Sequence, residues 1–141
     1  MKVAVQRRER ISRARQVQHL QAAAQAAQAE GLVAHLKAQS SQIAHLSTSM
    51  TPAPGGATRA VTLSNTGELA MRLREAHVQL SRALSEAQVK AAERSAERVE
   101  ARIREESARQ LVDRARAALE ELYDRRMAAL ALRRRIAGTE E

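Results

Sequence analysis

The sequence predicts an all-α fold: a long two-helix antiparallel coiled-coil hairpin in which the C-terminal helix is longer than the N-terminal one. Three observations lead to this prediction. Ala, Arg, Glu, Gln and Leu dominate the chain of 141 residues, and all five residue types favour helices. Apolar residues recur at alternating spacings of three and four, which is the heptad pattern of coiled coils. A single segment rich in Pro and Gly separates two such patterned stretches.

The composition argues against a compact globular core. The chain has no Phe, no Trp and one Tyr, whereas large aromatic rings supply much of the buried area in ordinary domains. It also has no Cys, which excludes a disulfide framework and a thiolate zinc site and fits a reducing compartment. No stretch approaches the roughly 20 apolar residues of a membrane span. We therefore expect a soluble, cytoplasmic protein.

The break between the two helices lies at Thr51–Thr58, which contains both prolines of the chain and two adjacent glycines. Proline lacks an amide donor and glycine has a freely variable backbone, so both end helices. We expect one domain over residues 1–141, made of a helix at 3–50, a loop at 51–66 and a helix at 67–137.

The first helix carries a stripe of mostly apolar residues at heptad spacing. Its members are Leu32, Leu36, Gln39, Ile43, Leu46 and Met50. Continued towards the N-terminus, the same spacing passes through Ala29, Gln25, Ala22, Gln18, Arg15 and Ile11, so the stripe becomes less apolar. The alanine-rich run around residues 22–27 predicts a narrow face that a partner helix can approach closely.

The second helix has a start signal at Asn65-Thr66-Gly67-Glu68, which resembles a capping box. Its first stripe again has heptad spacing and consists of Leu69, Leu73, Ala76, Leu80, Ala83 and Ala87. The apolar residues further along are four apart, namely Val99, Ile103, Ser107, Leu111, Ala115 and Leu119. Since a run of fours exceeds the helical repeat of about 3.6 residues, we expect this stripe to drift around the helix.

The unequal lengths predict an overhang. If the chain folds back at the break, Ile11 lies near Glu106, and roughly the last 20–25 residues project beyond the first helix. This segment is amphipathic, with Tyr123 and Met127 among its apolar residues and an arginine cluster near its end. A lone amphipathic helix is poorly stable in water, so we expect it to bind a partner.

The net charge of +8 is concentrated near the two ends of the chain. Residues 1–15 contain five Arg and one Lys against a single Glu, and a second basic group follows residue 124. Three interpretations stay open: a solvated basic face, a basic tip that docks into an acidic protein, and a surface that binds nucleic-acid phosphates. The N-terminal arginines superficially resemble a leucine-zipper basic region but lack its base-reading Asn.

No group of residues is arranged for catalysis. The four histidines have no ligand spacing, so we expect no metal site. The adjacent acidic residues at 105–106 and 120–121 point about 100° apart on a helix and form no acid–base pair. Gly55-Gly56 is not followed by the lysine of a phosphate-binding loop. We expect a protein that is not an enzyme and has no cofactor.

The whole-chain pattern resembles the FliJ family of flagellar type III export proteins and the related YscO-like proteins of injectisomes. The resemblance rests on the arginine-rich opening into an Ala/Gln-rich helix, on Gly56-Ala57-Thr58 near the turn, and on the closing run from Ala115 to Arg126. That run is similar to a recurring family element of the form LE-LxxRR. The resemblance to the family implies a coiled-coil stalk that contacts two proteins of the export apparatus.

The resemblance implies an export ATPase ring as the partner of the chain ends and an export gate protein as the partner of the region near the loop. Export chaperones are a further expected class of partner, and the protein is expected to be peripheral at the inner face of the cell membrane. The implied ATPase-ring contact consists of Arg7, Arg8, Arg10, Leu119, Leu122, Tyr123, Arg125 and Arg126. The implied gate contact consists of Gln39, Ile43, Leu46, Met50, Leu69, Leu73, Ala76 and Leu80. The family often has aromatic residues in this patch, and this chain has none there.

Two other functions are consistent with the residues alone. The first is a basic coiled-coil dimer that binds nucleic acid, with affinity that falls steeply with salt. The second is an assembly scaffold that forms larger oligomers through the overhang. No small-molecule substrate is expected in any of these cases.

Overall fold

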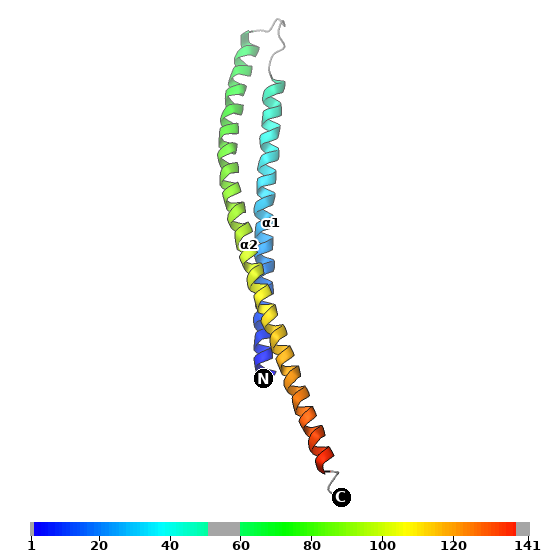
Figure 1. Cartoon of the computed structure of the whole chain (residues 1–141). Coiled ribbons are helices and arrows are strands. Elements are labelled where there is room, and N and C mark those ends of the chain that lie inside the picture. Colours follow the sequence, from blue (N-terminus) through cyan, green and yellow to red (C-terminus); the bar gives the residue numbers. More distant parts are fainter. Residues whose placement is uncertain (1, 51–59, 138–141) are drawn as a thin grey trace. The chain divides into compact units, whose positions relative to one another are not determined.

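The computed structural model describes residues 2–50 and 60–137, and every residue in these ranges other than Met50 is helical. Helix α1 spans Lys2–Ser49 and helix α2 spans Ala60–Ala137 (Figure 1). The prediction of an all-helical chain with a longer C-terminal helix is confirmed for these residues. The predicted break at Thr51–Thr58 lies outside the described residues.

Helix α2 begins at Ala60, so the predicted loop is wrong over residues 60–66 and the predicted start at residue 67 is wrong, while residues 51–59 of that loop lie outside the described residues. The proposed capping residues lie inside the helix instead. The Thr66 hydroxyl donates to the Leu63 carbonyl at 2.9 Å, and Glu68 pairs with Arg72 in the next turn at 2.6 Å. Residues 60–64 contain no Pro or Gly, so nothing in them opposes a helix, and Thr66 bonds back within the preceding turn.

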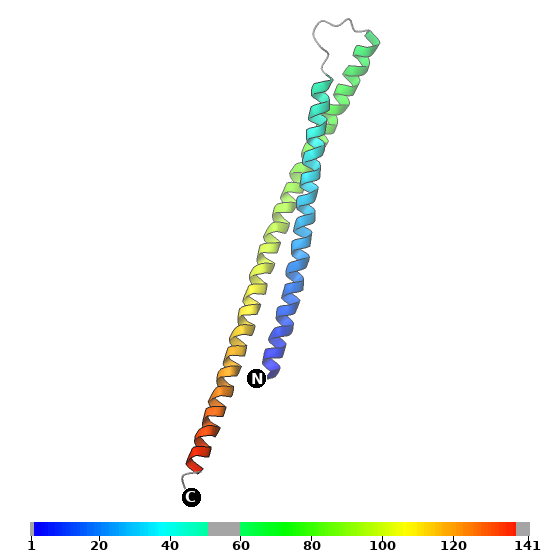
Figure 2. The ribbon, with the colours of Figure 1, turned by 90° about the vertical axis from the view of Figure 1, so that its right-hand side faces the viewer.

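Contacts group the chain into two units. Unit 1 consists of residues 1–22 and 98–141, and unit 2 consists of residues 23–97. Each unit pairs a stretch of α1 with a stretch of α2. In unit 1 the blue start of α1 lies beside the yellow part of α2, and in unit 2 the cyan part of α1 accompanies the green part of α2 (Figure 2). The expectation of one domain over residues 1–141 stays a prediction.

In unit 2 the covered side chains have heptad spacing on both helices. On α1 they include Ala26, Ala29, Val33, Leu36, Ser40 and Ile43, and on α2 they include Ala70, Leu73, Leu80, Leu84, Ala87 and Ala91. The alternation of three and four is what keeps one face of a helix turned towards its partner. This row of covered residues is called the seam below.

Alanines are the most deeply buried residues of unit 2. Ala26 has no exposed surface and Ala87 is 5% exposed. A side chain of one methyl group can be covered to this extent only if the neighbouring helix comes close to its backbone. The prediction that the alanine-rich run offers a narrow face agrees with this burial.

Two predicted seam positions are displaced by one residue, and a third, Leu46, is exposed. Leu32 and Leu46 are about half exposed, at 50% and 51%, while Val33 next to Leu32 is half-buried. On α2, Leu69 is 44% exposed and Ala70 is half-buried. Heptad spacing alone favours the larger leucines, whereas in the packed helices the smaller Val33 and Ala70 are covered and Leu32 and Leu69 lie beside the seam.

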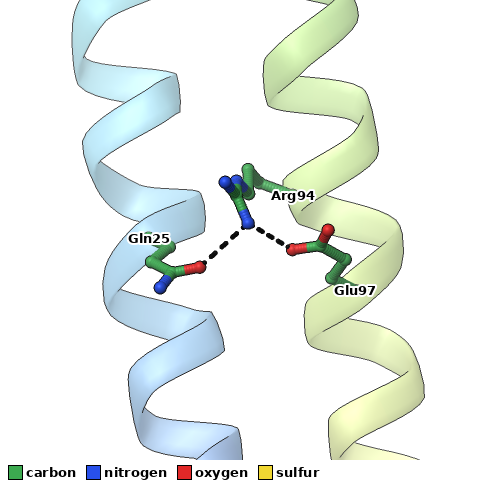
Figure 3. Close-up of polar contacts among 3 residues, drawn as sticks. All are labelled: Gln25, Arg94 and Glu97. Atoms are coloured by element: carbon green, nitrogen blue, oxygen red, sulfur yellow. Dashed lines mark hydrogen bonds and ion pairs between the residues drawn. The ribbon is translucent and has the colours of Figure 1, made fainter.

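A polar contact also joins the helices in unit 2. The Arg94 guanidinium donates to the Gln25 side-chain oxygen at 3.1 Å and lies 2.7 Å from a Glu97 carboxylate oxygen (Figure 3). Glu97 therefore orients the arginine across the gap between the helices. Arg94 and Glu97 are about half exposed, so the contact contributes to geometry more than to stability.

The seam of unit 1 keeps heptad spacing to Leu122. Its members on α2 are Arg98, Ala101, Glu105, Ala108, Val112, Ala115, Leu119 and Leu122. The stripe of residues four apart drifts around the helix as predicted: Val99, Ile103 and Leu111 are each more than half exposed, whereas Ala115 and Leu119 are covered. The seam itself does not drift, because Ala108 and Val112 occupy it where the stripe lies outside.

Two polar pairs cross between the helices of unit 1. Arg116 donates to Glu9 at 2.6 Å, and the His19 Nδ1 atom lies 2.6 Å from a Glu105 oxygen. Glu9 precedes His19 on α1, whereas its partner Arg116 follows Glu105 on α2, so the two helices run in opposite directions within unit 1. The predicted proximity of Ile11 and Glu106 is incorrect, because Glu9 and Ser12 on either side of Ile11 line a hollow with Val112 and Arg116.

We predict that Ala26→Leu lowers the free energy of unfolding by about 1–3 kcal/mol, because the fully covered methyl group leaves no space for a larger side chain. Urea titration followed by circular dichroism measures this change. Ala27→Leu is the control, since Ala27 is exposed and its replacement should stay within about 0.5 kcal/mol of the wild type. Equal effects at the two positions would contradict a close approach at Ala26.

Candidate interaction surfaces

The first candidate surface is the overhang, defined as residues 123–133 of α2. Every side chain in this range is exposed, in contrast to the seam that ends at Leu122. Its large apolar members are Tyr123 at 64%, Met127 at 49%, Leu130 at 53% and Leu132 at 60% exposed. In unit 1 this part of α2, orange to red in Figure 1, continues past the start of α1. An exposed apolar group of this kind is typical of a protein-binding surface.

A hollow adjoins the beginning of the overhang. It has a volume of about 420 Å³ and is lined by Lys2, Val3, Leu119, Leu122, Tyr123 and Arg126. Leu119 and Leu122 are half-buried at its base, while Val3 and Tyr123 are mostly exposed. Four of its six lining residues are apolar or aromatic, and Lys2 and Arg126 add one basic side chain from each helix.

The structure brings together four residues of the predicted ATPase-ring contact: Leu119, Leu122, Tyr123 and Arg126. Arg125 is exposed and pairs with Glu121 one turn earlier at 3.3 Å. Arg7, Arg8 and Arg10 are exposed on α1 and do not line the hollow. Lys2 and Val3 were missed, because only the packing of α1 against α2 shows that they lie beside Leu119.

The sequence near the start of α1 is rich in arginine and contains one carboxylate, that of Glu9, which pairs with α2. Glu9 accepts hydrogen bonds from both Nε and Nη2 of Arg116, at 3.2 Å and 2.6 Å. The hydrogen bond to Glu9 raises the pKa of the Arg116 guanidinium above its ordinary value, so this arginine stays charged. Glu9 is paired with Arg116 of α2, while Arg8 and Arg10 on either side of it in the sequence are exposed.

The second candidate surface is a groove in unit 2 with a volume of about 350 Å³. It is lined by Ile43, Ala44, Ser47, Leu73, Arg74, His77 and Val78. The lining is mainly apolar, with Arg74 and His77 as its ionisable groups. Ile43 and Leu73 were predicted as gate-contact residues, whereas Arg74, His77 and Val78 were not.

The other predicted gate-contact residues have different environments. Gln39, Met50, Ala76 and Leu80 are half-buried. Leu46 and Leu69 are exposed beside the seam and are accessible to a partner. The predicted set thus mixes residues that hold the two helices together with residues that a second protein can reach.

A polar region lies along unit 1. His19, Arg102, Glu105, Glu106, Arg109, Gln110 and Asp113 line one hollow, and Glu105, Arg109 and Asp113 also line a second one with Glu9 and Arg116. Acidic and basic residues are nearly balanced there. Within residues 2–50 and 60–137, no group of three or more His, Asp and Glu side chains is placed to hold a metal ion.

Neither helix, over its described residues, contains a stretch long and apolar enough to cross a membrane. Comparison with known proteins finds no family model, no curated protein and no solved structure that matches the chain. The candidate surfaces therefore rest on the geometry and chemistry of the chain itself.

We predict that Leu122→Ala lowers the free energy of unfolding by about 1 kcal/mol, because neighbouring residues cover most of this residue. Leu132→Ala removes the same atoms from a side chain that is 60% exposed, and its effect should stay within about 0.5 kcal/mol. Chemical denaturation of both variants provides the measurement. A cost at Leu132 as large as at Leu122 would mean that the overhang packs against the chain's own residues.

Proposed function

We propose that the chain is an antiparallel coiled-coil hairpin that serves as a non-enzymatic stalk or adaptor of a type III protein export ATPase. In this role it links and activates the ATPase ring and contacts the export gate protein. The single observation that carries the proposal is the overhang, which exposes four large apolar side chains next to basic ones. Helical surfaces of this kind gain stability when a partner covers them.

The order of the contacts supports the hairpin. In unit 1 the pairs Glu9–Arg116 and His19–Glu105 run in opposite directions along the two helices. In unit 2 the heptad spacing of covered residues on both helices is typical of a coiled coil. A closed helix pair leaves its charged faces in water and concentrates binding at the residues that the pairing does not cover.

The hollow at Leu119, Leu122 and Tyr123 supports the ATPase side of the proposal. It combines apolar side chains, which supply binding energy when buried, with Lys2 and Arg126, which favour an acidic partner. The exposed Arg7, Arg8 and Arg10 extend the basic surface of unit 1. A protein ring with an acidic inner rim would complement these groups.

The apolar groove of unit 2 supports the gate side. Ile43 and Leu73 line it, and Leu46 and Leu69 are exposed nearby along the same two helices. Arg74 and His77 at the groove give a partner two polar anchors. The protein would then act at the inner face of the cell membrane, where both partners of such an export system lie.

We predict that adding the protein to the cognate export ATPase stimulates ATP hydrolysis. Tyr123→Ala combined with Arg126→Glu should reduce this stimulation about tenfold, because an aromatic anchor and a cation leave the centre of the contact. Arg82→Glu is the control, since it makes the same charge change at an exposed α2 position in unit 2. Steady-state hydrolysis assays measure the effect. The absence of any complex with the ATPase and with the gate protein would reject the stalk function.

We further predict that Leu46→Glu combined with Leu69→Glu abolishes binding to the gate protein while the helix content stays unchanged. Both leucines are about half exposed, so a charge there is tolerated by the chain but not by an apolar partner surface. Pull-down assays and circular dichroism give the two readouts. Ser41→Glu, at an exposed α1 position, is the matched control.

The same samples separate the two rival functions. A nucleic-acid-binding dimer would bind duplex DNA with an affinity that falls steeply between low and physiological salt. An assembly scaffold would form larger oligomers at higher protein concentration. These oligomers would dissociate when Tyr123 and Leu130 are replaced. Neither result is expected for a stalk.

A further inference from the structure

An exact dipeptide repeat lies on α2 within unit 1. Ala101-Arg102, Ala108-Arg109 and Ala115-Arg116 recur every seven residues. The three alanines are covered members of the seam, and the three arginines are exposed beside it. Because seven residues make two turns of a helix, the alanines share one face and the arginines share a neighbouring one. If α1 moved along α2 by one heptad, roughly 10 Å, it would meet the same alanines and arginines again.

The ion pair between Glu9 and Arg116 does not distinguish these two positions. Its nitrogen–oxygen distance is 2.6 Å in the observed arrangement. After a one-heptad shift Glu9 would meet Arg109, an identical side chain in an equivalent place. Arg109 already lines the same hollow as Glu9. This pair therefore stabilises either register by the same interaction.

The pair between His19 and Glu105 does distinguish them. Its atoms are 2.6 Å apart, and both side chains are about three-quarters covered, with 25% and 27% exposed. The seam residues of α2 that are seven apart on this side are Arg98, Glu105, Val112 and Leu119, among which Glu105 is the only acidic one. A shift would bring His19 to Arg98 and would leave Glu105 beside Ser12. A largely covered carboxylate that loses its polar partner is costly.

We propose that unit 1 can adopt two registers one heptad apart, and that the His19–Glu105 pair selects the observed one. The alanine and arginine repeat makes the two registers similar in energy. The His19–Glu105 pair forms in only one of them and so favours it. One polar layer inside a heptad seam is a known way to select one register at some cost in stability. A slide of one helix along another is also an established form of conformational switch. The pair is thus the place where a register change in this chain would be controlled.

The chain lacks cysteine, so disulfide trapping can report the register directly in the full-length protein. Ser12→Cys with Val112→Cys reports the observed register, because both residues line one hollow on the seam. Val5→Cys with Val112→Cys reports the shifted register, because Val5 precedes Ser12 by one heptad. Val5→Cys with Gln110→Cys matches neither register and reports fraying. Disulfides require Cα atoms within about 7 Å, which makes each pair selective.

We expect the shifted pair to link at least about tenfold more slowly than the native pair at dilute concentration, as measured by initial rates on non-reducing gels. His19→Ala should raise the rate of the shifted pair about tenfold while the fraying pair and the helix content stay constant. Glu9→Gln is the matched control, since it also removes a cross-helix ion pair but one that is the same in both registers, and it should leave the ratio unchanged.

Three results would overturn the proposal. The first is an unchanged ratio of shifted to native linking in His19→Ala. The second is an equal rise in Glu9→Gln, which would show that any lost ion pair loosens the helices. The third is a parallel rise of the fraying pair, which would show unfolding of unit 1 without a second register. A second variant, His19→Ala with Glu105→Ala, removes both polar groups and should show the same redistribution without an unpaired carboxylate.

Discussion

Close approach of two helices over small side chains is the constraint on which the rest of this structure depends. The five buried residues of the described chain are Ala26, Ala87, Ala108, Val112 and Ala115, and none of them is large. Each contributes little apolar area, so the hydrophobic gain per layer is modest. Stability must therefore accumulate over many heptads, which accounts for the great length of both helices. The same constraint leaves leucines such as Leu32 and Leu46 exposed on a flank, while Leu36, Leu73 and Leu80 are half-buried members of the seam.

A seam of repeated alanines allows several registers of the two helices, and polar contacts across the seam favour one of them. Alanine against alanine fits equally well at several registers, because each layer resembles the next. His19 with Glu105 adds a contact that only one alignment provides, and Arg94 with Gln25 adds a further polar contact between the helices. Partly covered polar contacts of this kind add little net stability, because desolvation offsets much of their attraction. The effect of the His19–Glu105 pair is to distinguish otherwise equivalent arrangements.

The functional surfaces follow from what the pairing leaves uncovered. Once α1 and α2 share their seams, the remaining apolar surface lies at the overhang, in the groove at Ile43 and Leu73, and at flanking leucines such as Leu46 and Leu69. The overhang differs from the flank because, in the described residues, α1 reaches only its beginning, where Lys2 and Val3 line a hollow with Tyr123 and Arg126. Arginines accompany its apolar side chains, so a partner has to supply both an apolar surface and negative charge. These two requirements are why we assign binding to this region in preference to the charged faces.

The sequence by itself determined the helical class, the two-helix organisation, the longer second helix and the alanine-rich face, because helix propensity and heptad spacing are local properties. It also identified Leu119, Leu122, Tyr123 and Arg126, which do come together. The start of α2, the seam positions and the partners of Glu9 and His19 were decided only by tertiary structure. A choice between Leu32 and Val33 depends on how closely the opposite helix approaches, and the position of Lys2 and Val3 beside Leu119 depends on the register. Both are properties of the packed pair of helices, and neither helix encodes them alone.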